Sequence, residues 1–91
     1  MTDNKFTKGE WKIFNERVGV IDNSDTQSFG MMIEVAYIDM YNFGEEEREA
    51  NANLIAAAPD MYEMLEFISA NPSEVNVVQI RNLLSKARGE L

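Results

Sequence analysis

The chain has 91 residues, a formal net charge of −8, and neither cysteine nor histidine. This length predicts a single domain over residues 1–91 with one modest core. Without cysteine the chain forms no disulfide or thiolate metal site, and without histidine it lacks the commonest general base. Its apolar runs are far shorter than the roughly 20 residues that span a bilayer. We therefore expect a cytoplasmic protein that does not bind membranes.

Acidic residues are concentrated in the middle of the chain. From Val18 to Glu74 there are 12 carboxylates and one basic residue, Arg48, whereas the other basic residues lie toward the two ends. Direct nucleic-acid binding is disfavoured, because phosphates require a basic surface. A partner protein with a basic surface, or a protein site that normally holds nucleic acid, is electrostatically compatible. The alternative is that the acidic surface only keeps a small protein soluble.

The first part of the chain reads as an arm followed by strands. Residues 1–9 are polar apart from Phe6 and show no periodicity, which predicts a flexible arm. Alternating β-branched and aromatic residues predict about three antiparallel strands over residues 11–40. Asn15–Arg17 would form a tight turn or a bulge, and residues 22–28 a hairpin loop. In the third strand, we expect one face to carry Met31, Ile33, Val35 and Tyr37, with Glu34 on the other face.

A helix is predicted over residues 43–70, with Asn42 and Glu45 forming a capping box. Its apolar positions keep a 3.6-residue period through Pro59, and they are Ala50, Leu54, Ala57, Met61, Leu65 and Ile68. Proline removes a backbone hydrogen bond and disfavours helical angles at the preceding residue. Either the helix kinks, or one helix ends and another begins there. In both cases the alanines 56–58 would allow close approach to the sheet, with Ala57 buried.

A second helix is predicted over residues 72–88. Asn71 is the expected N-cap, Pro72 the first helical residue and Glu74 the end of a capping box, while Gly89 suits the stop. Its apolar face comprises Val77, Ile80, Leu84 and Ala87, flanked by Val78 and Leu83. Strands followed by helices indicate an α+β fold, in which a small antiparallel sheet (11–40) is packed by a Pro-kinked helix (43–70) and a C-terminal helix (72–88).

No catalytic residue, metal site or cofactor is predicted, so we expect a protein that is not an enzyme. The acidic run at residues 45–49 is explained by the preference of helix N-termini for negative charge. Asp22 and Asp25 lie in a turn that lacks the glycine and glutamate of a calcium loop. Tyr62, Met64 and Phe67 flank the apolar stripe, which makes them candidates for a partner surface or a homodimer contact.

At residues 50–65, ANANLIAAAPDMYEML, the sequence resembles a family of small proteins of tailed phages and prophages. These proteins have a β-hairpin or meander that begins near a tryptophan, followed by a helix of the type ANAxLIAAAPELLEAL. Here Trp11 and the intervening strands occur in the expected order. Met61, Tyr62 and Met64 replace the usual leucine-rich continuation, which would alter the exposed face of the helix.

The resemblance implies a phage-encoded protein. Small, acidic phage proteins without cysteine or catalytic residues often act by binding a host protein, so we expect an inhibitor of a host protein in the host cytoplasm. Together with the acidic segment, this expectation suggests an inhibitor of a host defence nuclease, for instance an anti-CRISPR protein that mimics nucleic acid. The candidate partner-binding residues are Glu45, Glu49, Asp60 and Glu63 on one flank of the first helix, with Tyr62 and Phe67 as an apolar surface. The alternative function is that of a phage structural or assembly accessory protein acting through homo-oligomerisation.

Overall fold

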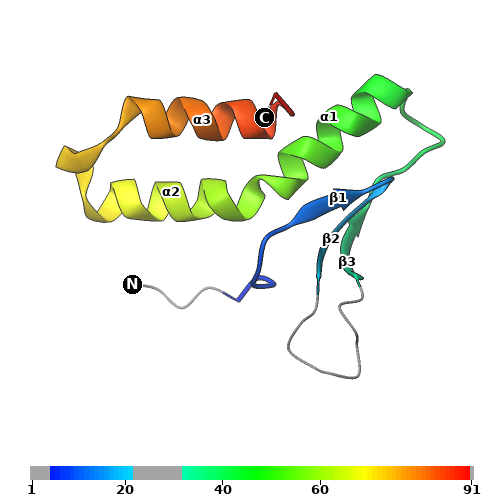
Figure 1. The fold of residues 1–91 in the computed structure, drawn as a ribbon, viewed down its shortest axis with the longest axis horizontal. Helices are drawn as coiled ribbons and strands as arrows, with labels where there is room; N and C mark the ends of the chain where they lie inside the picture. The colour runs from blue at the N-terminus through cyan, green and yellow to red at the C-terminus, as the bar shows by residue number, and fades with distance from the viewer. Residues whose placement is uncertain (1–4, 22–31, 91) are drawn as a thin grey trace.

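The computed structural model describes residues 5–21 and 32–90, so the expected hairpin loop and the start of the expected arm lie outside the described residues. A three-stranded antiparallel sheet in the order β1–β2–β3 precedes three α-helices (Figure 1). The strands are β1 (Lys12–Phe14), β2 (Arg17–Ile21) and β3 (Met32–Tyr37). The helices are α1 (Glu45–Ala56), α2 (Ala58–Ala70) and α3 (Val77–Ala87), with a 3₁₀ turn, η1 (Pro72–Glu74), before α3. The predicted α+β fold is confirmed.

A tight turn and a bulge set the register of the sheet. Phe14 pairs with Arg17 across a turn in which Asn15 has a φ of 58°, a left-handed conformation that asparagine tolerates. Between β2 and β3, Val18 lies opposite Ala36 whereas Gly19 lies opposite Glu34, so β3 has one extra residue at this point. A bulge of this kind reverses the alternation of side chains.

The predicted single apolar face of β3 is therefore wrong. Before the bulge Ile33 pairs with the buried Val20, but after it Tyr37 pairs with the exposed Arg17. The Arg17 guanidinium lies 5.7 Å from the centre of the Tyr37 ring, on the face away from the core. Ala36 instead packs against the core. The predicted Met31 lies outside the described residues.

The long helix is divided at Ala57, one residue before α2 begins. Ala57 N–H donates to Asn53 O (3.1 Å), and Met61 N–H donates to Ala57 O (3.0 Å), so backbone hydrogen bonds continue across the bend. Pro59 lies in the first turn of α2, where a missing N–H costs no helical bond. Of the two alternatives predicted for this region, the structure has the second, in which one helix ends and another begins. The interruption is the single residue Ala57, which separates α1 from α2.

Both predicted capping boxes are wrong. The N-cap of α1 is Gly44, because the Asn42 side-chain amide donates to Asp39 instead. Asn71 ends α2 and also precedes η1, whose first residue is Pro72 as predicted, but its side-chain amide donates to Phe67 O (3.0 Å) and its side chain caps no backbone N–H of η1. The N-cap of α3 is Asn76, whose side-chain oxygen accepts from the backbone N–H groups two and three residues later. The last helix consequently starts at residue 77 rather than 72.

The core lies between α1 and the sheet. Its buried members are Val18, Ile38, Ala52 and Ala56, with Trp11, Ala36 and Ile55 packed against them. Alanines at positions 52 and 56, one helical turn apart, let α1 approach the sheet closely. The predicted stripe is wrong in α1, where Ala50 and Leu54 are exposed. The break at Ala57 explains the difference, because α1 and α2 do not share one continuous face.

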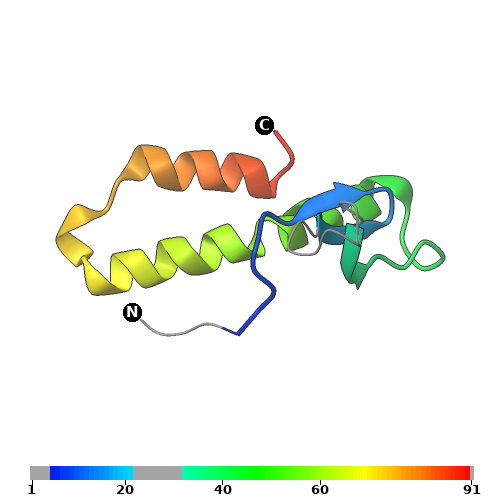
Figure 2. The same cartoon turned by 60° about the horizontal axis from the view of Figure 1, so that its bottom comes forward.

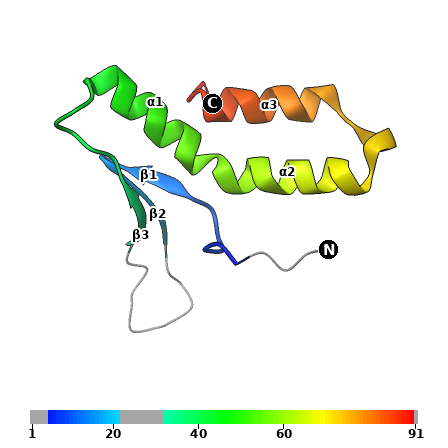
Figure 3. The same cartoon turned by 180° about the vertical axis from the view of Figure 1, so that it is seen from behind.

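Outside the core, α2 and α3 run antiparallel, side by side and beyond the end of the sheet (Figures 2 and 3). The end of α3 returns to α1. Gly89 has a φ of +77°, and its N–H donates to Lys86 O (3.0 Å), while Glu90 N–H donates to Ser85 O (2.8 Å). This pair of bonds is a Schellman motif and confirms the predicted stop at Gly89. A Cβ at Gly89 would collide with the Asn53 side chain of α1.

The described part of the predicted arm makes contacts with the body of the protein. The Phe6 ring packs edge-on against Trp11 and Tyr62, with ring centroids 6.3 Å and 5.2 Å away. The Trp11 indole N–H donates to Thr7 O at 3.0 Å. Residues 5–9 contain no helix or strand, but these contacts link them to β1 and α2.

Candidate protein-binding surfaces

The loop between β3 and α1 is organised by two charged side chains. Asp39 Oδ1 accepts the backbone N–H groups of Tyr41 (2.8 Å) and Asn42 (3.3 Å), and these bonds, with the Asn42 amide, hold the pKa of Asp39 below its ordinary value. The Arg48 guanidinium donates to Phe43 O (2.8 Å) and Met40 O (3.2 Å). These hydrogen bonds hold both ends of the loop in place, and α1 begins directly after it.

The start of α1 forms an acidic surface. All four glutamates at positions 45, 46, 47 and 49 are exposed. None of them forms an ion pair with another residue in the described part of the chain. Arg48, the one basic residue among them, is half-buried because its guanidinium reaches back to the loop carbonyls. The negative charge of this helix end is thus left facing solvent. We call these four residues the α1 acidic surface.

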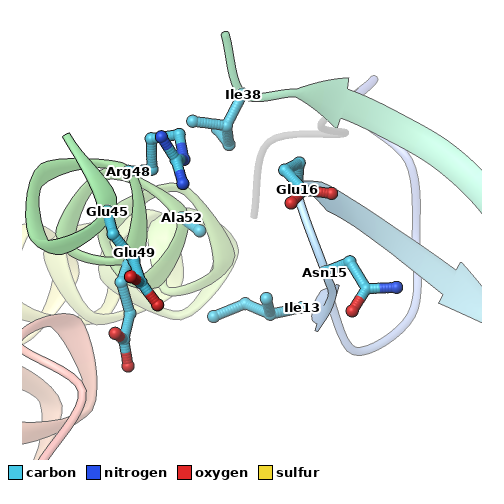
Figure 4. Close-up of a pocket in the computed structure, with 8 residues that line it drawn as sticks. All are labelled: Ile13, Asn15, Glu16, Ile38, Glu45, Arg48, Glu49 and Ala52. Atoms are coloured by element: carbon cyan, nitrogen blue, oxygen red, sulfur yellow. The ribbon is translucent and has the colours of Figure 1, made fainter. Parts of the chain in front are cut away.

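A pocket of about 280 Å³ separates the α1 acidic surface from the β1–β2 turn (Figure 4). Its lining comprises Ile13, Asn15, Glu16, Ile38, Glu45, Arg48, Glu49 and Ala52. Glu45 and Glu49 project from one side of the pocket, and Glu16 lies on the other (Figure 4). Glu45 and Glu49 were predicted from the sequence as binding residues, whereas Glu16 was not. The β1–β2 turn places Glu16 at this pocket, and no local sequence pattern predicts that position.

The two remaining predicted carboxylates lie elsewhere. Asp60 and Glu63 line a depression of about 430 Å³ with Met64, Phe67 and Gln79. Asp60 also accepts from the Lys86 ammonium group, which ties α2 to α3. The bend at Ala57 lies between the two pairs. The structure therefore places Glu45 with Glu49 at one pocket and Asp60 with Glu63 at another.

Tyr62 and Phe67 are both partly exposed on α2. They project to different sides of the helix, since five helical residues correspond to a rotation of about 140°. The Tyr62 ring contacts Phe6, whereas Phe67 lines the same depression as Asp60. A third surface was not identified from the sequence as one feature. It is an apolar groove between α2 and α3, with a volume of about 220 Å³.

Within residues 5–21 and 32–90, no group of three or more acidic side chains is arranged to hold a metal ion. None of the helices in these ranges combines the length and apolar character needed to cross a bilayer.

Comparison with known proteins shows which family the chain belongs to. The model of one protein family, described as Salmonella phage P22 protein Y8K6, matches residues 1–91. The chain belongs to this family. The resemblance to a phage protein family is thereby confirmed. No curated protein and no solved structure matches the chain.

Proposed function

We propose that this member of the P22 Y8K6 family binds a host protein through a basic surface of that protein. Most specifically, it inhibits a host defence nuclease, such as a CRISPR effector, by occupying a channel that normally holds nucleic acid. The observation that carries the proposal is the α1 acidic surface, in which four exposed carboxylates surround an arginine that is bonded to backbone carbonyls.

Electrostatics support this choice of surface. Four like charges within five residues repel one another, and the positive end of the helix macrodipole offsets only part of that repulsion. A channel lined with lysine and arginine would supply the missing opposite charges, raising both the association rate and the selectivity for basic sites. Because these side chains are exposed, binding would require little rearrangement of the α1 backbone.

Two of the predicted binding residues are better suited than the others to a charge-reversal test. Asp60 already has an internal partner in Lys86 and contributes to the contact between α2 and α3. Reversing its charge would therefore test the fold as well as binding. Glu45 and Glu49 lack such a partner among the described residues and lie one helical turn apart, so they are the better residues to change.

The decisive experiment has a genetic part and a biochemical part. The protein is expressed in hosts that each carry one defence nuclease, and the plating efficiency of a sensitive phage is measured. For any nuclease that is overcome, cleavage by the purified enzyme is then assayed with and without the protein. We expect inhibition that weakens steeply as salt rises, because exposed charges are screened within about 10 Å at 0.1 M ionic strength.

A matched pair of variants tests the surface itself. Glu45→Lys with Glu49→Lys should abolish inhibition while leaving the circular dichroism spectrum unchanged. Glu10→Lys with Glu74→Lys changes the net charge equally on exposed residues outside α1 and outside the predicted binding residues, and should inhibit almost as well as the parent. Equal loss in both variants would assign binding to overall charge, and full activity in the first would remove the α1 acidic surface from the mechanism.

A second candidate function is favoured by the exposed apolar side chains of α2 and α3. In this alternative, the protein is a structural or assembly accessory of the phage that acts through homo-oligomerisation. Deleting its gene and growing the phage on a host without defence nucleases separates the two functions. A defence inhibitor is dispensable on that host, whereas an assembly protein is still needed for a normal yield of particles.

A further inference from the structure

The groove between α2 and α3 is lined by apolar side chains alone. They are Met61, Met64, Leu65 and Ile68 from α2 and Ile80, Leu83 and Leu84 from α3. The spacing of three and four residues within each set places its members on one helical face. The two helices thus turn matching apolar faces toward a shared groove of about 220 Å³.

This face is poorly covered within the single chain. No residue of α3 is buried, and Pro59 is the only buried residue of α2. At the groove, Leu65 is 67% exposed and Leu84 is 46% exposed. Most of the stability of short helices in proteins comes from covering an amphipathic face, since isolated helices of this length are marginal in water. The α2–α3 face therefore lacks the cover that such helices normally have.

The charges of the two helices favour a second copy as the partner. All charged residues of α2 are acidic and all those of α3 are basic. Asp60 and Lys86 pair with each other within the chain. Glu63 of α2 and Arg81 of α3 form no ion pair among the described residues, so these two opposite charges remain for a partner. A two-fold axis parallel to the two helices, lying in the plane of the contact, would place α2 of one copy against α3 of the other. Arg81 lies three residues from Leu84.

We propose that two copies of the chain pair through the α2–α3 face, with Leu65 and Leu84 of each copy entering the groove of the other. The two helical pairs then form a four-helix arrangement with two-fold symmetry, in which each α2 faces the partner's α3. This dimer does not depend on the proposed function. A dimer is compatible with nuclease inhibition and with an assembly role alike.

The test is the molar mass in solution, measured by sedimentation velocity over a wide range of protein concentration. The parent should approach twice the chain mass of 10.4 kDa. Leu65→Asp should raise the dimer dissociation constant at least about tenfold, because it buries an unpaired carboxylate in an apolar contact. Leu54→Asp is the matched control, since Leu54 is a similarly exposed leucine on α1, at 52%. It should leave the dimer intact.

Two results would overturn the proposal. One is a parent protein that stays monomeric at every concentration, even if it inhibits a nuclease. The other is a dimer that Leu54→Asp disrupts and Leu65→Asp does not, which would place the interface on α1. If Leu65→Asp fails to fold, the contact is tested instead by hydrogen exchange of the parent protein. Amide exchange in α2 and α3 should then slow as protein concentration rises, and exchange independent of concentration would refute the contact.

Discussion

The bend at Ala57 offers a direct test of how α1 and α2 fit the rest of the protein. Ala57 is fully buried, at 0% exposure, and its backbone N–H and carbonyl both take part in hydrogen bonds across the bend. A leucine there would bring a larger side chain into a site without free surface, while the backbone bonds restrict any shift. We expect Ala57→Leu to lower the free energy of unfolding by about 1–3 kcal/mol.

Urea unfolding followed by circular dichroism measures this loss, with protein concentration held fixed because association also changes apparent stability. In a thermal scan, each kcal/mol lost from the free energy of unfolding lowers the Tm of a domain of this size by about 4–8 °C. Ala50→Leu is the control, because Ala50 is exposed on α1 and leucine forms helices nearly as well as alanine. Ala57→Leu with the stability of the parent, or equal losses in both variants, would show that the bend is not closely packed.

Three further predictions concern the ends of elements. Asn76→Ala should cost about 1 kcal/mol in urea unfolding, because it removes the N-cap of α3. Gly89→Ala should cost at least about 1 kcal/mol in the same assay, since alanine disfavours the left-handed conformation and would collide with Asn53. Asp39→Ala should destabilise the protein at neutral pH. That difference should disappear as pH falls through the lowered pKa of Asp39, because only the ionised carboxylate is favoured by its hydrogen bonds.

Element types and order followed from the sequence because they depend on local patterns. Strand alternation, turn residues and a 3.6-residue period act over a few neighbours, and they predicted three strands followed by helices. The same locality explains the errors at helix ends. Asn42, Asn71 and Asn76 all have the side chain of an N-cap, and the choice among them depends on partners such as Asp39 and Phe67 O. Those partners become evident only when the chain is folded.

The candidate site was predictable in composition but not in arrangement. The predicted alignment of four carboxylates on one flank requires a straight helix. The division at Ala57 separates Glu45 and Glu49 from Asp60 and Glu63. The pairing of Asp60 with Lys86 joins residues far apart in the sequence, which periodicity does not detect. Arg48 was counted against the acidic charge of its segment, yet its bonds to two carbonyls follow from the course of the loop before α1.

The apolar faces of α2 and α3 show what periodicity can establish about a partner. A stripe at helical spacing indicates that a face will be covered, but the free energy of burying Leu65 or Leu84 is the same whether the cover comes from the same chain or another. The sequence therefore predicted burial of both residues, and the fold leaves both exposed. Here α1 packs against the sheet, and its buried alanines, Ala52 and Ala56, lie at this contact. Among the described elements the sheet contacts α1 and neither α2 nor α3. The proposed pairing of two copies would supply the cover that the apolar faces of α2 and α3 lack.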